Sequence, residues 1–276
     1  MCRHLILNML NGPMKKRKSP KNSRKSDAGP SRPRTNPGIW IYGRHACLAV
    51  LANPRRQLSR LLLTDNAARD LTLDGLVLPI EPEMVDRSVI EALLQPDCVH
   101  QGIAILATPL PVTALRSILQ PLEEHSSAVF LALDQANDPR NIGAILRTSS
   151  AFNVSGIIVP DRGTPEESGA LAKAAAGALE SVPLIRVTNL VRTLDELKQD
   201  GFWCVGLDGY CDRNISDMDF TGRTVVVLGA EGKGLRRLTR ETCDHLCKIS
   251  ISSAMESLNL SNAAAITLYE ISRQHR

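Results

Sequence analysis

Aromatic residues are scarce in this chain, which has three Tyr, four Phe and two Trp among 276 residues. A surface that binds nucleic acid mainly by stacking bases on aromatic rings uses many of them, so we do not expect extensive base stacking. Long apolar runs are also missing, and none approaches the roughly 18 residues that a membrane-spanning helix needs. The opening MCRHLILNML has too short an apolar core for a signal peptide. We therefore expect a soluble protein with no membrane partner.

The cysteines form no disulfide framework. There are seven, an odd number, and the chain is long enough to fold without covalent staples. The segment CDHLC at 243–247 lacks a second pair of ligands at zinc-site spacing, which favours packing over metal binding. We expect no metal and a reducing, cytoplasmic compartment.

Familiar nucleotide and nucleophile motifs are absent as well. The glycines of VVVLGAEGKGL (225–235) follow the spacing G-x-x-G-x-G, which is neither the dinucleotide fingerprint nor a Walker A loop. This disfavours a nucleotide-dependent oxidoreductase. No Ser-His-Asp arrangement and no acidic metal cluster accompanies the loop, so hydrolysis by these routes is not indicated.

Charge is distributed unevenly. Residues 1–37 carry ten Lys or Arg and one acid, whereas the rest of the chain holds 23 basic and 28 acidic residues. We predict that 1–37 is a disordered basic tail. Basic tails either contact nucleic acid or only solubilise a protein, and the tail alone does not decide between these.

The remaining chain divides into two predicted α/β domains. Residues 38–108 hold an expected strand and helix within 38–54, strands at 58–65, 76–80 and 100–110, and a helix at 83–94. Residues 109–126, rich in proline, are a predicted linker with one short helix. From 127 to 276 strands alternate with helices, which predicts a mostly parallel sheet covered on both faces. Ligands of such sheets bind where the strands end.

Three polar segments follow predicted strands of 127–276. The first, NDPRNIGAILRTSSAF (137–152), carries Asn141 and Arg147 on a predicted helix; the second carries Glu231 in the glycine loop; the third, SLNLSNAAAI, carries Ser257 and Asn259 before the last helix. Each alone fits an ordinary cap, turn or solvated charge. Together they place amide, guanidinium, carboxylate and hydroxyl groups at one edge of a sheet.

These segments also resemble a known family. NDPRNIGAILRTSSAFNVSGIIV, VVVLGAEGKGLRRLTRETCDHLCKISI and MESLNLSNAAAITLYE are similar, in order, to the three motifs of the SpoU (TrmH-like) RNA ribose 2′-O-methyltransferases of the SPOUT superfamily. Residues 38–108, from IYGRHACLAVLA to VHQGIAILA, resemble the L30e-like substrate-binding domain of the bacterial 23S rRNA guanosine-2′-O-methyltransferases.

The resemblance implies a fold, a cofactor and partners. It implies a C-terminal trefoil knot that binds S-adenosylmethionine, a homodimer with the active site at or near its interface, and an RNA substrate, most consistent with a guanosine of 23S rRNA. General topology rules alone predict an unknotted sheet. By motif position it assigns catalytic roles to Asn141, Arg147, Glu231, Ser257 and Asn259, and cofactor binding to Leu228, Gly229, Ile249 and Leu258.

Within this scheme Arg147 either takes the proton of the ribose hydroxyl, helped by a phosphate, or stays charged and stabilises the developing alkoxide. Asn141 would orient Arg147 or the ribose, and Glu231 would hold the guanidinium or its neighbours. Two departures from the family pattern stand near the cofactor loops: Asn262 replaces a small apolar residue, and KISISSAMES lacks a proline. The alternatives are a tRNA ribose methyltransferase and a non-catalytic RNA-binding factor of ribosome assembly.

Overall fold

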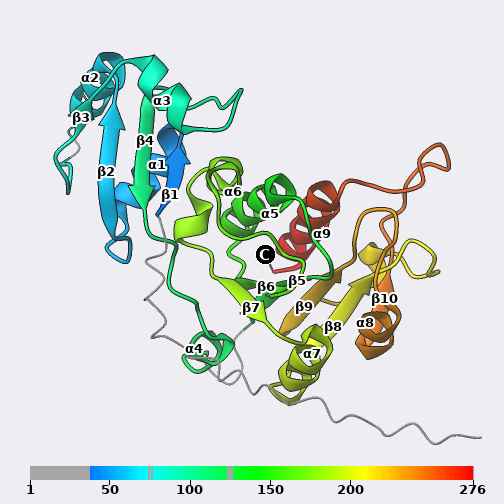
Figure 1. Ribbon diagram of the computed structural model, residues 1–276. Coiled ribbons are helices and arrows are strands. Elements are labelled where there is room, and N and C mark those ends of the chain that lie inside the picture. The colour runs from blue at the N-terminus through cyan, green and yellow to red at the C-terminus, as the bar shows by residue number, and fades with distance from the viewer. Residues whose placement is uncertain (1–37, 74, 76, 123–126, 276) are drawn as a thin grey trace, which may run out of the picture. The chain divides into compact units, whose positions relative to one another are not determined.

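Two β-sheets organise the structure, a computed structural model that describes residues 38–73, 75, 77–122 and 127–275 (Figure 1). The predicted basic tail, 1–37, lies outside the described residues. Among the described residues, no helix is long and apolar enough to cross a membrane.

The smaller sheet belongs to the N-terminal part of the chain. Its four strands run in the order β1-β4-β2-β3, with β4 antiparallel to both β1 and β2, and β3 parallel to β2. Its strands and helices are β1 (Ile39–Tyr42), α1 (Arg44–Ala52), β2 (Leu58–Leu63), α2 (Asp65–Leu73), β3 (Glu83–Met84), α3 (Arg87–Leu93) and β4 (Ile103–Ala107). The short helix expected in 109–126 is present as α4 (Leu115–Leu119).

Six parallel strands form the larger sheet, in the order β10-β8-β9-β5-β6-β7. The strands are β5 (Val129–Leu133), β6 (Gly156–Pro160), β7 (Leu184–Val187), β8 (Trp203–Leu207), β9 (Thr224–Leu228) and β10 (His245–Cys247). The intervening elements are α5 (Pro139–Ala151), α6 (Gly169–Ala175), η1 (Ala178–Glu180), α7 (Leu190–Gln199), η2 (Ile215–Asp217), α8 (Arg237–Thr242) and α9 (Leu260–Gln274). The predicted parallel sheet is confirmed.

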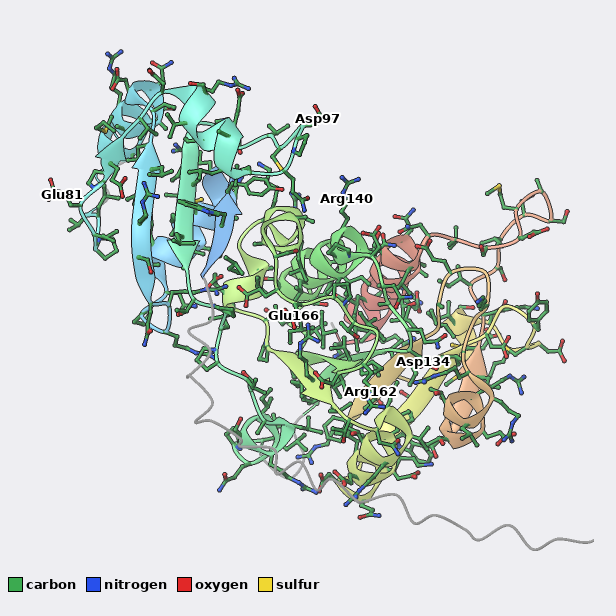
Figure 2. The ribbon with its side chains drawn as sticks, viewed as in Figure 1. Glu81, Asp97, Asp134, Arg140, Arg162 and Glu166 are labelled. Carbon is green, nitrogen blue, oxygen red and sulfur yellow. The ribbon has the colours of Figure 1, made fainter. Side chains whose placement is uncertain are left out.

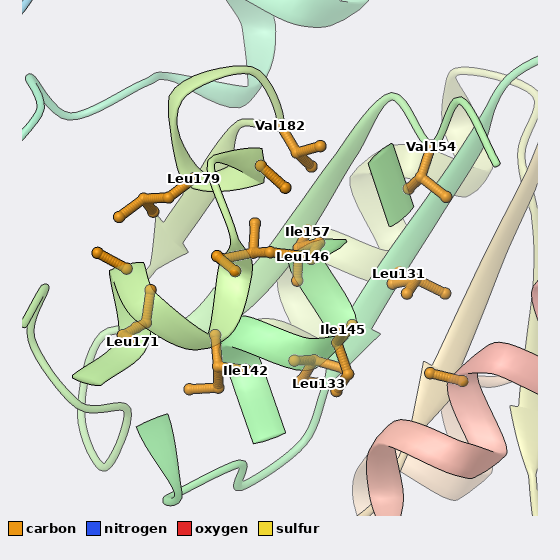
Figure 3. Packing of buried hydrophobic residues seen from close by; sticks show 14 of the residues in the cluster. Leu131, Leu133, Ile142, Ile145, Leu146, Val154, Ile157, Leu171, Leu179 and Val182 are labelled. Carbon is orange, nitrogen blue, oxygen red and sulfur yellow. The ribbon is translucent and has the colours of Figure 1, made fainter. Parts of the chain in front are cut away.

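Apolar side chains on both faces of this sheet explain why helices cover it on two sides. Alternate residues of a strand point to opposite faces. Leu131 and Leu133 of β5 pack in the cluster that contains Ile142 and Ile145 of α5, as Figure 3 shows. Phe130 belongs to the cluster on the other face, which α7 covers. Strands that are buried on both faces carry continuous apolar runs, so the apolar run at 128–133 predicts a buried strand.

Three local expectations were wrong. No strand is present at 77–80; pairing with β2 occurs instead at Glu83–Met84, so the helix expected at 83–94 begins only at Arg87. The helix expected at 168–180 breaks where Ala176 and Gly177 adopt positive φ. The strand expected at 246–251 ends at Cys247, and the chain beyond it turns into the loop that precedes α9. Sequence reasoning also missed α2.

Candidate active site

The carboxyl ends of three neighbouring strands build a pocket of 340 Å³. Because β8, β9 and β10 are adjacent and parallel, the loops that follow them leave the same edge of the sheet. The pocket is lined by residues of all three loops, among them the four that the family resemblance assigned to the cofactor, Leu228, Gly229, Ile249 and Leu258. All four therefore lie on one pocket, where the ligands of parallel sheets bind. Their contact with the cofactor stays a prediction.

Gly229 allows two backbone segments to approach closely in the loop after β9. A Cβ added there would lie 2.1 Å from the carbonyl carbon of Gly234 and 2.3 Å from the amide nitrogen of Leu235, so no larger residue fits. Ala230 and Gly234 exchange two backbone hydrogen bonds of 3.1 and 2.9 Å, which close the loop on itself. The tip of this closed loop carries Glu231.

A buried carboxylate holds the same loop against the centre of the sheet. Asp134 follows β5 directly and is fully shielded from solvent. Its Oδ1 accepts from Nε of Arg236 at 2.6 Å, and its Oδ2 accepts from the Arg236 backbone N–H at 3.1 Å. Charge-assisted pairs of this kind fix geometry strongly. Sequence reasoning did not assign Asp134 a role, although a carboxylate after a buried strand was the available signal.

Asn141, Glu231 and Asn259 form one hydrogen-bonded cluster. Asn141 Nδ2 donates to Glu231 Oε1 at 2.7 Å, and Asn259 Nδ2 donates to the same oxygen at 2.8 Å. Asn259 Nδ2 also lies 3.1 Å from Asn141 Oδ1, and the Leu260 backbone N–H reaches Glu231 Oε1 at 3.1 Å. One carboxylate oxygen thus joins all three polar segments that the sequence singled out.

Helix termini bring the two asparagines together. Asp138 caps α5 by accepting from the Arg140 N–H at 2.8 Å, and Pro139 occupies the first helical position, so Asn141 falls in the first turn. Asn259 caps α9 in the same way, with Oδ1 accepting from the Ser261 N–H at 2.9 Å. Helices α5 and α9 pack side by side (Figure 1). Their first turns therefore meet at the loop that carries Glu231.

Arg147 and Ser257 lie outside this cluster. Arg147 is exposed, and it makes no hydrogen bond or ion pair with any residue that the structure describes. Six residues of α-helix turn through about 600°, which leaves Arg147 and Asn141 about 120° apart around the axis of α5, on different faces. Ser257 is exposed and lines the 340 Å³ pocket. Among the described residues, Glu231 accepts from Asn141, Asn259 and the Leu260 N–H and makes no contact with Arg147. Its predicted role of holding the guanidinium or its neighbours stays a prediction.

Asp208 forms a further part of the pocket that sequence reasoning missed. It follows β8 directly and accepts from Nε of Arg240 at 2.5 Å and from the Tyr210 backbone N–H at 2.9 Å. Burial raises the pKa of this carboxyl, but the bonds from Arg240 and Tyr210 outweigh burial and leave the pKa below its usual value. Asp208 is therefore charged at neutral pH and fixes the loop that carries Tyr210, another residue on the pocket.

Titratable groups at this site do not gather into a metal centre. No group of three or more His, Cys, Asp or Glu that could hold a metal ion is present in the described part of the chain. The thiols of the buried Cys204 and Cys247 and of the half-buried Cys243 have pKa values raised to about 12, chiefly by desolvation. They are therefore protonated at neutral pH and poor nucleophiles. The other polar groups at the site are amides, hydroxyls, carboxylates, guanidinium groups and the ammonium group of Lys248.

Two protein-family models and several known proteins match this chain. A model described as the SpoU rRNA Methylase family matches residues 128–269, and one described as RNA 2′-O ribose methyltransferase substrate binding matches residues 40–113. The 23S rRNA (guanosine-2′-O-)-methyltransferase RlmB of Pseudomonas aeruginosa is 39% identical over 238 residues, which cover 85% of this chain and 96% of that protein. The enzyme of the same name from Vibrio vulnificus is 37% identical over 239 residues, with coverages of 85% and 96%.

Among solved structures, the SpoU methyltransferase AviRb from Streptomyces viridochromogenes in complex with AdoMet is similar, with a TM-score of 0.71 and 25% identity. The match covers 86% of this chain and 90% of that one. These matches span the two sheets and all three polar segments. The chain therefore belongs to the SpoU rRNA methylase family, as its three motifs indicated, and carries an N-terminal RNA ribose methyltransferase substrate-binding region.

Proposed function

We propose that this chain transfers the methyl group of S-adenosylmethionine to the ribose 2′-hydroxyl of a guanosine in 23S rRNA. The names of the curated relatives and the AdoMet complex of a related fold support this assignment. The observation that carries it is the position of Glu231, which lines the 340 Å³ pocket and also joins Asn141 to Asn259. The proposed cofactor site and the polar cluster proposed to bind the methyl-accepting nucleotide thus share one residue.

The residues of the pocket fit such a cofactor. Leu207, Leu228, Ile249 and Leu258 offer apolar contacts, and Gly229 exposes backbone without a side chain in the way. When bound, S-adenosylmethionine supplies an electrophilic methyl group. This chain then has to hold the cofactor and the ribose in a fixed relative orientation. Binding them in this way raises the rate, because the entropy of orienting the two reactants is lost on binding and not in the chemical step.

The polar cluster would position the ribose. Glu231 Oε1 is already engaged by two side-chain amides and one backbone N–H, so its role is to fix Asn141 and Asn259 rather than to accept a proton. We propose that the two asparagines, with Ser257, hydrogen-bond the acceptor nucleotide. Arg147 would stabilise the alkoxide as the hydroxyl proton leaves, because a guanidinium stays protonated near neutral pH.

Arg147 further supports a homodimer. It leaves α5 on a different face from Asn141, and α9, packed beside α5, exposes Ile266 and Tyr269. Exposed apolar residues on one of two packed helices, and on the other an exposed cation with no partner among the described residues, favour contact with a second chain. We propose that a second copy docks on this α5–α9 face and that Arg147 of one copy completes the site of the other.

We make four further proposals. Residues 38–108 form a domain that binds RNA, and residues 127–276 form the catalytic domain. Residues 109–126 are the linker between the two domains. The segment around the cofactor pocket forms a trefoil knot. The basic tail, 1–37, strengthens RNA binding through phosphate contacts, which predicts steeper salt dependence for the full chain than for a chain that lacks it. We also propose that the enzyme acts in the cytoplasm, because its proposed substrate is ribosomal RNA.

Methyl transfer tests the proposed function directly. Purified protein is incubated with tritiated S-adenosylmethionine and unmodified 23S rRNA, with bulk tRNA as a parallel substrate and Arg147→Ala as the inactive control. Label should enter 23S rRNA as 2′-O-methylguanosine. Binding of the cofactor without transfer to any RNA would favour the non-catalytic assembly factor, and label in tRNA alone would favour the tRNA enzyme.

Mixing two inactive variants tests the dimer. Arg147→Ala and Asn141→Ala each remove one half of the proposed composite site. If the two halves come from different chains, a mixed dimer holds one site with both residues intact, and activity returns. Mixing that restores nothing, with a dimer seen by sedimentation, would place both residues in the same chain's site.

A further inference from the structure

A second pocket adjoins the proposed cofactor site on the side of the polar cluster. Its volume is 290 Å³, and it shares Ala230, Glu231 and Leu260 with the first pocket. Its other lining residues come from the loop between β5 and α5, from Asn141 and from Lys233. A group held here lies across Glu231 from the cofactor pocket.

Several polar groups on this second pocket have no partner. Asp138 uses Oδ1 to cap α5, but its Oδ2 accepts no hydrogen bond from the described residues. The side chains of Asn137 and Lys233 make no hydrogen bond or ion pair within that same part of the chain. The neighbouring Arg140 extends away from the start of α5 (Figure 2) and does not line the pocket. Among the described residues, the pocket thus offers free carboxylate oxygens of Asp138 and Glu231 as acceptors. It also offers the side chains of Gln135, Asn137 and Lys233 as donors.

We propose that this pocket binds the base of the target nucleotide and that Asp138 reads it as guanine, an inference that rests on the proposed function. Guanine has N1–H and N2–H donors side by side, with the O6 acceptor next to them. The Asp138 carboxylate accepts from such donors, while Lys233 and the Asn137 amide donate to O6. Adenine, cytosine and uracil lack two adjacent N–H donors, so none of them satisfies the carboxylate equally well.

The base must leave its stack to enter. Enzymes and RNA-binding domains read unstacked bases through their Watson–Crick edges. The scarcity of aromatic residues in this chain is consistent with recognition by hydrogen bonds rather than by stacking. Asp138 is exposed in the free protein, and a bound base would cover its carboxylate. A base without a matching N–H donor would then leave that carboxylate desolvated and unpaired, which penalises the wrong base.

The capping role of Asp138 can be separated from base reading. Asn caps a helix about as well as Asp, so Asp138→Asn retains one oxygen for the Arg140 N–H. The same change replaces the free oxygen by an amide donor, which cannot accept from guanine. A variant that preserves α5 and loses only the proposed contact is therefore available.

The test compares guanosine with inosine, which lacks only the N2 amino group, at the methylated position of a short 23S rRNA fragment. Wild-type protein should methylate the guanosine fragment with a kcat/KM about tenfold or more above that for inosine, as expected for one hydrogen bond to a charged group. In Asp138→Asn the guanosine value should fall and the ratio should approach one. Cofactor affinity by calorimetry should not change in this variant, which shows an intact fold.

Two results would overturn the inference. An unchanged guanosine-to-inosine ratio in Asp138→Asn would leave Asp138 as a cap only. A ratio near one in the wild-type protein would assign the pocket to the sugar–phosphate backbone. If wild-type protein methylated neither fragment nor intact 23S rRNA, the proposed function itself would fail, which is a distinct outcome. Lys233→Met should weaken both fragments equally, because both retain O6.

Discussion

Arg56 provides the sharpest stability prediction, because its guanidinium is buried among groups distant in sequence. Its side chain is 0% exposed, and its Nη2 lies 2.6 Å from Oε1 of Glu180 and 2.5 Å from Oε1 of Glu167. Its Nη1 donates to the Thr108 carbonyl at 2.8 Å, and Asn53 Nδ2 donates to Glu180 at 2.7 Å. The cluster joins the turn after α1 to the segments around α6.

Arg56→Met removes the cation and leaves two carboxylates that are 13% and 7% exposed. Breaking a buried pair by removing one partner costs about 3–5 kcal/mol, mostly because the remaining charge is uncompensated. We expect the free energy of unfolding to fall by that amount in urea melts, with an unchanged dependence on urea concentration. Adding Glu167→Gln and Glu180→Gln should recover most of the loss.

A matched control is the exposed pair of Arg192 and Glu196, whose side chains are 79% and 40% exposed at a separation of 3.1 Å. Arg192→Met should cost about 0.3–0.5 kcal/mol, as exposed pairs on helices do. A loss below about 1 kcal/mol in Arg56→Met would refute the reasoning, because burial would then add nothing to the pair.

Three other changes test separate features. Gly229→Ala should abolish cofactor binding in calorimetry, since its Cβ would lie 2.1 Å from the Gly234 carbonyl carbon; normal affinity would contradict the close approach. Burial, with Arg87 nearby, lowers the pKa of His100, against the opposing effect of Glu91. The folded state then binds fewer protons than the unfolded chain, so stability should fall as pH drops below about 6.5. His100→Gln should flatten this slope in urea melts at pH 5–7. Native Cys204 should resist thiol reagents at pH 7 and react only on unfolding, because burial raises its pKa to about 12.

The parallel sheet could be predicted from sequence because buried strands carry continuous apolar runs. The run at 128–134 and the glycine loop after 228 contain enough local information to locate strand ends. The two-residue strand Glu83–Met84 could not be predicted, since its identity depends on pairing with β2 and not on its own residues. The partners of Arg56 lie 111 and 124 positions away, and charge alone does not reveal which acid a buried arginine meets.

The candidate site, like the fold, could be predicted from the sequence only in part. Its residues could be named from motif order, and the pocket contains those assigned to the cofactor. The hydrogen bonds among these residues could not be predicted from the sequence. The packing of α5 against α9 determines that Asn141 and Asn259 meet at one oxygen of Glu231. Sequence reasoning had considered Asn141 as a helix cap, whereas Asp138 caps α5 and frees Asn141 for the cluster.

The central claim is that this chain methylates the ribose of a guanosine in 23S rRNA. The most direct measurement maps ribose methylation across all RNA from cells with and without the gene, with Asn141→Ala restored in a third strain. The predicted result is one 23S guanosine that loses its 2′-O-methyl group without the gene and is not rescued by the variant. An unchanged 23S map, or a loss confined to tRNA, would contradict the claim.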